Sequence, residues 1–212
     1  MYLKSIKAVG FKSFADKIEL DIKDGITCIV GPNGSGKSNI LDAVKWVLGE
    51  QSVKSLRGSG SMSDVIFNGS KSRSPMSRAS VALTIDNSNH YLKSEFNEIE
   101  VKRVVYRSGE NEYYLNNTKV RLKDITDLFI DSGASRDAYN IISQGTVEDI
   151  VSSKPEARRV IIEEAAGVLK YKKHKEESLR KLEKTKDNLN TINLLISELE
   201  TSLEPLRIQS IK

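Results

Sequence analysis

Apolar and polar positions alternate with a period of two near the start of the chain, which predicts β-strands over residues 3–11 and 18–22. Residues 26–30 are mostly β-branched and apolar on both faces, a pattern typical of a central strand in a mixed or parallel sheet. After a Gly-rich stretch, apolar residues recur at helical spacing over residues 40–48, and Gly49 is a natural helix stop.

The pattern predicts a mixed sheet with further helices in the rest of the globular part. Asn116-Asn117 has the composition of a hairpin turn leading into residues 119–120. A Ser-rich stretch over residues 70–77 indicates a surface loop, and helical spacing returns at residues 123–130 and 147–151. The other segments predicted as strands are residues 65–67, 80–85, 100–107 and 112–115.

The composition changes near residue 155. No glycine follows Gly167, no aromatic residue follows Tyr171, and the remainder is rich in Lys, Glu and Leu. We therefore expect a globular domain over residues 1–154 and a protruding helix within residues 155–212. A helix over residues 156–204 is about 74 Å long at 1.5 Å per residue, and Pro205 is expected to interrupt it.

Apolar residues in this tail repeat in alternating steps of three and four, which is the spacing of a coiled-coil seam. Such a long helix cannot bury its seam within a small globular part, so a partner helix is expected. In this chain alone, the seam predicts homodimerisation or aggregation; the alternative is a single helix lying back on the globular part. The seam positions are Leu182, Thr185, Leu189, Ile192, Ile196, Leu199, Leu203 and Leu206.

Composition narrows the candidate chemistry. The chain has 212 residues, with 33 basic and 29 acidic residues and a net charge of +4, which permits nucleic-acid binding without arguing for it. One cysteine excludes an intrachain disulfide, and two distant histidines make a His or Cys metal site unsupported. No apolar run approaches the roughly 20 residues of a membrane helix. We expect a cytoplasmic protein without membrane contact.

Residues 31–38, Gly-Pro-Asn-Gly-Ser-Gly-Lys-Ser, match the phosphate-loop pattern G-x-x-x-x-G-K-[ST] at every fixed position. The glycines let successive N–H groups point inward, and the following helix directs its positive dipole end to the same point. Lys37 is expected to reach the β- and γ-phosphates, and the Ser38 hydroxyl to ligate Mg²⁺. The alternatives are a Gly-rich turn that binds nothing and a dinucleotide fingerprint, whose third glycine is missing. The loop therefore predicts binding of a Mg²⁺-nucleotide, either ATP or GTP.

Hydrolysis also needs an acidic residue at the end of an apolar strand to hold Mg²⁺ and a catalytic carboxylate, and the sequence lacks the patterns of both. No apolar run ends in Asp-Asp or Asp-Glu, and no Leu-Ser-Gly-Gly stretch is present. The closest run is residues 128–131, which Ser132-Gly133 follows in a segment with helical spacing. We therefore expect that the chain alone does not hydrolyse nucleotide.

Several strings, in order over residues 1 to about 175, resemble the structural maintenance of chromosomes (SMC) family, in particular its bacterial condensin-type members. Several of the strings are long and specific, so a chance match is negligible, and together they span most of the chain. They are residues 10–14, 31–39, 46–52, 55–58, 64–67, 106–109, 121–125, 142–145 and 163–167.

The resemblance implies an ABC-type P-loop ATPase head that is split between the two ends of a longer chain. This chain then supplies the N-terminal lobe and the start of an antiparallel coiled coil, and the signature and Mg²⁺-binding acidic motifs lie beyond residue 212. ATP binding engages two heads, hydrolysis releases them, and the cycle acts on DNA in chromosome condensation and segregation. Implied partners are the chain's own C-terminal lobe, a second head, ScpA-type kleisin and ScpB-type subunits, and DNA bound without sequence preference, in the nucleoid.

The resemblance also assigns roles to single residues. Gln144 resembles the glutamine loop that contacts Mg²⁺ and the attacking water, although the residues alone favour a surface amide. Arg57 resembles an arginine that reaches the nucleotide phosphates, with a solvated loop arginine as the alternative. Lys12 is expected near the phosphates, while Arg121 and Lys123 match basic positions that face DNA. The nucleotide contacts carried over are Pro32, Asn33, Gly34, Ser35, Gly36, Lys37, Ser38 and Asn39.

Three other classes of protein stay open at this point. A transporter-type ABC ATPase has its glutamine loop much nearer the phosphate loop, whereas Gln144 follows Lys37 by 107 residues. A DNA-repair relative of the RecF or RecN type lacks the string at residues 46–52. In a DNA-binding coiled-coil structural protein the nucleotide is incidental, so Lys37→Ala leaves function intact.

Overall fold

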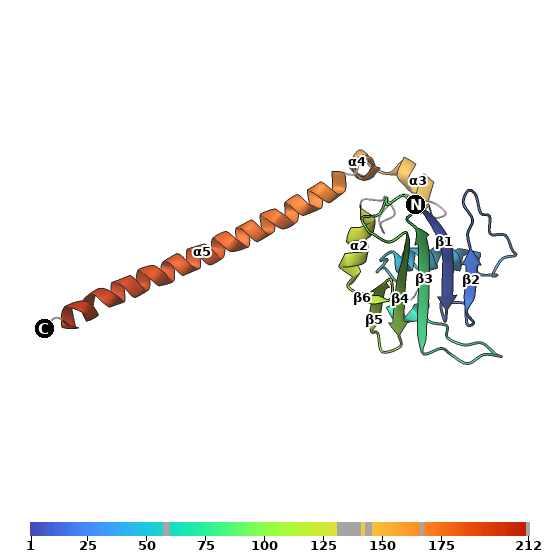
Figure 1. Cartoon of the computed structure of the whole chain (residues 1–212), viewed down its shortest axis with the longest axis horizontal. Coiled ribbons are helices and arrows are strands. Elements are labelled where there is room, and N and C mark those ends of the chain that lie inside the picture. The colour runs from blue at the N-terminus through green and yellow to red at the C-terminus, as the bar shows by residue number, and fades with distance from the viewer. Residues whose placement is uncertain (57–59, 131–140, 143–145, 166–167, 211–212) are drawn as a thin grey trace. The chain divides into compact units, whose positions relative to one another are not determined.

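The computed structural model describes residues 1–56, 60–130, 141–142, 146–165 and 168–210 (Figure 1). The chain divides into two compact units, Met1–Glu164 and Ala165–Lys212, which we describe separately. The predicted domain boundary at residue 154 stays a prediction.

The first unit contains a six-stranded sheet with the strand order β2-β1-β3-β4-β5-β6, and each pair of neighbours is antiparallel. Strands that follow each other along the chain mostly pair as hairpins, which short connections favour. The strands are β1 (Tyr2–Val9), β2 (Ile18–Asp21), β3 (Arg78–Asp86), β4 (Glu98–Tyr106), β5 (Asn111–Leu115) and β6 (Thr118–Val120).

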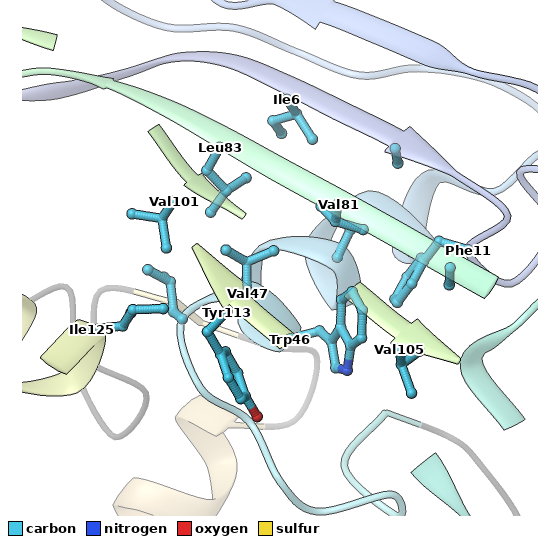
Figure 2. Close-up of a cluster of buried hydrophobic side chains, with 14 of the residues drawn as sticks. Ile6, Phe11, Trp46, Val47, Val81, Leu83, Val101, Val105, Tyr113 and Ile125 are labelled. Atoms are coloured by element: carbon cyan, nitrogen blue, oxygen red, sulfur yellow. The ribbon is translucent and has the colours of Figure 1, made fainter. Parts of the chain in front are cut away.

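One face of the sheet is covered by helix α1 (Lys37–Val47), which contacts β3 and β4. Alternate residues of β3 and β4 point to this face, and Trp46 and Val47 of α1 are fully buried against them (Figure 2). The Trp46 ring lies 5.2 Å from the ring of Phe11, centre to centre. The hydrophobic core of the first unit therefore joins the sheet directly to the helix that follows the phosphate loop.

Most predicted elements of the first unit are confirmed, including β1 to β6 apart from their end residues, α1, and the helices α2 (Leu122–Ile130) and α3 (Thr146–Ser152). The turn at Asn116-Asn117 is confirmed, with φ angles of 46° and 64°. A two-residue hairpin of this type needs positive φ at both central residues, which asparagine tolerates.

The predicted central strand at residues 26–30 is wrong: these residues belong to no strand in the structure. Ile26 is 96% exposed and Val30 is 89% exposed. A strand that is apolar on both faces needs neighbouring strands and cover on each side, and the described residues provide neither. The fold class, helices combined with a sheet, is confirmed, but the described sheet is antiparallel because the segment expected to make it mixed does not pair.

The predicted strand at residues 65–67 is also wrong. A 3₁₀ helix, η1 (Met62–Val65), occupies its start, and Ile66 forms a single bridge with Phe11. Ser61 and Asp64 form a capping box. The Asp64 carboxylate accepts a hydrogen bond from the Ser61 N–H, and the Ser61 hydroxyl oxygen accepts one from the Ser63 N–H. This local alternative stabilises a helical turn where alternation alone indicates a strand.

In the tail the structure describes helices α4 (Pro155–Ala165) and α5 (Val168–Ser210). Residues 166–167 lie outside the described ranges, so the single helix predicted from residue 156 stays a prediction. Pro205 does not end the helix as predicted, because α5 continues through it to Ser210. In the structure the apolar seam of α5 is exposed; Ile192, for example, is 55% exposed. None of the helices in the described ranges is long and apolar enough to cross a membrane.

Candidate nucleotide-binding site

The phosphate loop passes into α1 through two glycines in the left-handed region, Gly34 with φ 82° and Gly36 with φ 95°. Gly36 is the N-cap of α1, and no side chain among the described residues caps it. The first turn of α1 also contains no acidic residue. The Asn39 N–H already bonds the carbonyl of Gly36 at 2.9 Å. The N–H groups before it and the positive dipole end of α1 are left for an anion from outside the helix.

Gly36 is also enclosed by the segment that follows β1. A Cβ atom at this position would lie 3.0 Å from Cε1 of Phe14 and 3.1 Å from Oγ of Ser13. Nearby, Nδ2 of Asn39 donates a hydrogen bond of 2.7 Å to the same Ser13 hydroxyl. Both the backbone conformation and the lack of space thus require glycine here, and the loop is held against residues 13–14.

Lys37 reaches back over the phosphate loop. Its Nζ donates hydrogen bonds of 2.7 Å to the carbonyl oxygens of Gly31 and Pro32. Both acceptors are neutral, and a charged phosphate oxygen is a stronger partner for an ammonium group. The structure therefore places a positive charge beside uncapped helix N–H groups, which is the donor set that suits a nucleotide phosphate.

Lys12, expected near the phosphates, is engaged elsewhere in this structure. Its Nζ donates a hydrogen bond of 2.6 Å to Oδ2 of Asp42 in α1, and it also bonds the carbonyl oxygen of Leu56. The side chains of Lys12 and Asp42 are 14% and 7% exposed. Lys12 thus joins α1 to the segment that precedes Arg57, and its predicted contact with phosphate stays a prediction.

A cavity of about 340 Å³ lies next to the loop. Asn39, in the first turn of α1, is one of the residues that line it. Arg107, at the end of β4, holds another wall: its Nη2 donates to Oδ1 of Asn68 at 3.0 Å and to the carbonyl of Phe67 at 3.2 Å. The residues lining the cavity are Lys12, Asn39, Leu56, Asp64, Val65, Ile66 and Asn68.

The predicted Mg²⁺ ligands are only partly described. Ser38 is exposed in the first turn of α1, where its hydroxyl can supply one oxygen ligand. Gln144 and Arg57 lie outside the described residues. Within the described ranges, no three His, Cys, Asp or Glu side chains gather as a metal site. Mg²⁺ usually takes one or two protein oxygens and completes its shell with phosphates and water, so Ser38 fits a Mg²⁺-nucleotide better than a free ion.

Arg121 and Lys123, expected to face DNA, are both exposed at the start of α2. Arg121 is paired within its own turn, since Nε and Nη2 donate to the carboxylate of Asp124 at 3.3 and 3.1 Å. This ion pair raises the pKa of Arg121 and lowers that of Asp124. A phosphate contact by Arg121 must therefore compete with Asp124 or share the guanidinium with it.

Sequence reasoning missed three residues that shape this region: Asp42, Arg103 and Arg107. Arg103 could have been found, because it interrupts an apolar face of β4 between Val101 and Val105. A charge at an inward strand position is a signal that it has specific partners. The other two could not, since their partners lie at least 30 residues away along the chain.

The family model described as "RecF/RecN/SMC N terminal domain" matches residues 2–205. The chain belongs to this family. Among known proteins, it is 57% identical over 210 residues to the chromosome partition protein Smc of Bacillus subtilis, covering 99% of this chain and 18% of that protein. It is 52% identical to the protein of the same name from Clostridium kluyveri, over 100% of this chain and 18% of the relative. The chain thus spans 18% of the length of these curated relatives.

Solved structures agree with the SMC assignment. The Smc head domain of Pyrococcus furiosus, with an extended coiled coil and bound to the C-terminal domain of ScpA, matches with a TM-score of 0.75 and 37% identity, over 93% of this chain and 50% of that one. The SMC head domain of Thermotoga maritima matches with a TM-score of 0.59 and 43% identity, over 73% and 52%. A RecF structure at 22% identity shares the fold alone. The predicted SMC resemblance is confirmed, and the chain corresponds to the N-terminal part of an SMC head.

Proposed function

We propose that this chain is the nucleotide-binding N-terminal lobe of an SMC-type ATPase and that it binds Mg²⁺-ATP at residues 31–38. The observation that carries the proposal is the N-terminus of α1. No described side chain caps its first N–H groups, its first turn has no acidic residue, and the Lys37 ammonium lies over the adjoining loop. These features together suit a triphosphate better than any neutral ligand.

The cavity beside the loop suits the nucleoside part of the ligand. Its volume of about 340 Å³ falls at the lower end of small-molecule sites. Asn39 belongs both to this cavity and to the first turn of α1, so phosphates on the loop and a nucleoside in the cavity are adjacent. In this arrangement Ser38 supplies a Mg²⁺ ligand, Lys12 borders the nucleotide, and Arg57 and Gln144 act on the phosphates and the attacking water.

Hydrolysis requires a second segment in this proposal. Residues 26–30 present exposed apolar side chains and pair with no described strand, with Ile26 and Val30 at least 89% exposed. We infer that the C-terminal lobe of the longer protein pairs with this segment and brings the acidic and signature motifs that this sequence lacks. Two complete heads then sandwich two ATP molecules, ATP binding engages the heads, and hydrolysis releases them.

The wider assembly is proposed by analogy with the relatives. The exposed apolar seam of α5 is suited to the returning helix of an antiparallel coiled coil. A ScpA-type kleisin binds at the helix that leaves the head within residues 155–212, together with a ScpB-type subunit. The Smc head of Pyrococcus furiosus bound to the C-terminal domain of ScpA supports a ScpA-type partner. Arg121 and Lys123 contact DNA phosphates without sequence preference. The assembly acts on the bacterial nucleoid in chromosome condensation and segregation.

Nucleotide binding by the full 212-residue chain tests the first step. We expect Lys37→Ala to weaken the binding of Mg²⁺-ATP at least tenfold, because it removes the charged donor over the loop. The matched control is Lys23→Ala, which removes an exposed lysine elsewhere in the same unit. Equal binding by the wild type and both variants would contradict the proposed site and favour a structural protein in which nucleotide is incidental.

A further inference from the structure

Arg103 is a buried charge on the inward face of β4. It is 1% exposed, and its neighbours on that face, Val101 and Val105, are fully buried. Its guanidinium carbon lies 4.6 Å from the centre of the Trp46 ring and 5.0 Å from that of Tyr113; Figure 2 shows both rings in the core cluster. Taking a charge out of water is costly, so it has to be offset by specific contacts.

Those contacts are made with the C-terminal end of α1. Nη1 of Arg103 donates hydrogen bonds of 2.8 Å to the carbonyl oxygens of Trp46, in the last turn of α1, and of Glu50, just beyond it. Nη2 donates to Oδ1 of Asn111 at 3.1 Å. The C-terminus of a helix carries partial negative charge, and a cation placed there stabilises it. Arg103 thus fastens the end of α1 to the sheet.

Packing alone does not account for this residue. The Nε–H group of Arg103 is buried and has no hydrogen-bond partner among the described residues. Burial also lowers the pKa of the guanidinium to about 10. An apolar side chain of similar volume would fill the space without either penalty. What arginine provides, and an apolar residue does not, is a rigid set of donors: Nη1 fixes two carbonyl groups while Nη2 fixes Asn111.

The other end of α1 forms the proposed phosphate site. A helix of 11 residues is about 16 Å long, and a tilt of about 5° about one end moves the other by about 1.4 Å. We propose that Arg103 is a positioning residue for the phosphate site: by fixing the C-terminal end of α1, it sets where the N–H groups and the Lys37 ammonium lie. This inference rests on the proposed function of the site.

The same contacts extend the effect to a second part of the site. Arg103 holds the carbonyl of Glu50, and Lys12 holds that of Leu56, so both ends of the segment leading to Arg57 are fastened to α1 or its surroundings. Loss of Arg103 therefore removes a contact shared by this segment and the end of α1, leaving Glu50 held by the bond from its N–H to the carbonyl of Lys45.

Amide hydrogen exchange in the nucleotide-free full chain tests the positioning directly. We expect Arg103→Met to speed exchange of the hydrogen-bonded amides in the first half of α1, residues 39–44, by about tenfold through looser anchoring of α1. Val101→Ala is the matched control, since it creates a defect on the same strand and face but removes none of the hydrogen bonds that Arg103 makes to the end of α1. Faster exchange confined to residues 46–50 and 103–111, with residues 39–44 unchanged, would overturn the inference.

Nucleotide affinity gives a second and independent readout. At a temperature where each variant is folded, we expect the Kd for Mg²⁺-ATP to rise about tenfold in Arg103→Met and by less than about twofold in Val101→Ala. Arg103→Lys keeps the charge but not the fork and should fall between them; it also serves if Arg103→Met does not fold. Equal affinities in Val101→Ala and the Arg103 variants would overturn the inference. If the wild type itself does not bind Mg²⁺-ATP, the proposed function fails, while the exchange experiment still decides the positioning role.

Discussion

Two apolar segments flank the phosphate loop, and the structure treats them in opposite ways. Helix α1, after the loop, buries Trp46 and Val47 completely against the sheet. Residues 26–30, before the loop, leave Ile26 and Val30 at least 89% exposed. Both segments are apolar enough for a core. The difference is that strands β3 and β4 cover α1, whereas no described element covers residues 26–30.

This difference separates two kinds of hydrophobic surface in the chain. The core around Trp46 is complete within the first unit, so its contribution to stability is intrinsic to this chain. Residues 26–30 and the apolar seam of α5 contribute only when another segment covers them. Mutations should therefore affect the two kinds of surface in different assays.

The sharpest contrast is between Trp46 and Ile26. We expect Trp46→Ala to lower the free energy of unfolding by about 3–5 kcal/mol, through the cavity it leaves beside Phe11 and Arg103. Ile26→Ala should change it by less than about 0.5 kcal/mol, because the side chain is already in water. Urea denaturation of the chain measures both. Comparable losses in the two variants would show that residues 26–30 are packed in solution.

Ion pairs offer the same contrast between buried and exposed groups. Asp42→Asn removes the charge that pairs with Lys12, in side chains that are 7% and 14% exposed. We expect a loss of about 2–3 kcal/mol, because one partner of a largely buried pair is left uncompensated. Asp16→Asn breaks the pair with Arg73, whose side chain is 54% exposed, and should cost less than about 0.5 kcal/mol. Denaturation curves that shift equally would contradict the burial of the Lys12–Asp42 pair.

Glu112, in the hairpin of β5 and β6, makes the stability of the protein depend on pH. Hydrogen bonds from Lys119, Tyr106 and Tyr114 lower its pKa from 4.5 to about 2. A depressed pKa in the folded state stabilises the protein above pH 4.5, and this contribution is lost as pH falls from about 4.5 towards 2. Glu112→Gln should reduce the dependence of the melting temperature on pH in that window. Glu95→Gln, at an exposed position, should leave this dependence unchanged. An unchanged slope in Glu112→Gln would show that other carboxylates dominate.

The smallest effect on stability is expected in the seam of α5. Ile192→Glu replaces a side chain that is 55% exposed, so the free energy of unfolding of the first unit should not change measurably. Self-association of the chain should weaken, because the seam is the surface expected to pair. Sedimentation velocity at several concentrations measures this, with Asn190→Glu outside the seam as the control. Unchanged association in Ile192→Glu would place the contact elsewhere.

The sequence predicts the elements of this chain better than their partners. Alternation located β1, β3 and β4, and Asn116-Asn117 located the turn, because these signals are local and the sheet they build is complete. The phosphate-loop pattern likewise located the N-terminus of α1. The strand at residues 26–30 is wrong for the opposite reason: its apolar pattern is local, but a strand also needs pairing partners, and no described strand pairs with it.

Side-chain partners in the site were the least predictable part. Lys12 was expected at the phosphates and is bonded to Asp42 and Leu56, 30 and 44 residues away. Nothing local to Lys12 specifies those partners, since they are brought together by the packing of α1 on the sheet. Pro205 predicts an interruption of the helix, but α5 continues through it, because one missing N–H does not end a helix of 43 residues.

ATP turnover by the full chain, alone and mixed with a separately produced C-terminal lobe of the same protein, tests the central claim most directly. The claim is that this chain holds the nucleotide but is completed by another segment for hydrolysis. We predict no turnover alone and clear turnover in the mixture, lost in Lys37→Ala. Robust turnover by this chain alone would contradict the account, because it would mean that the catalytic acidic residues lie within these 212 residues.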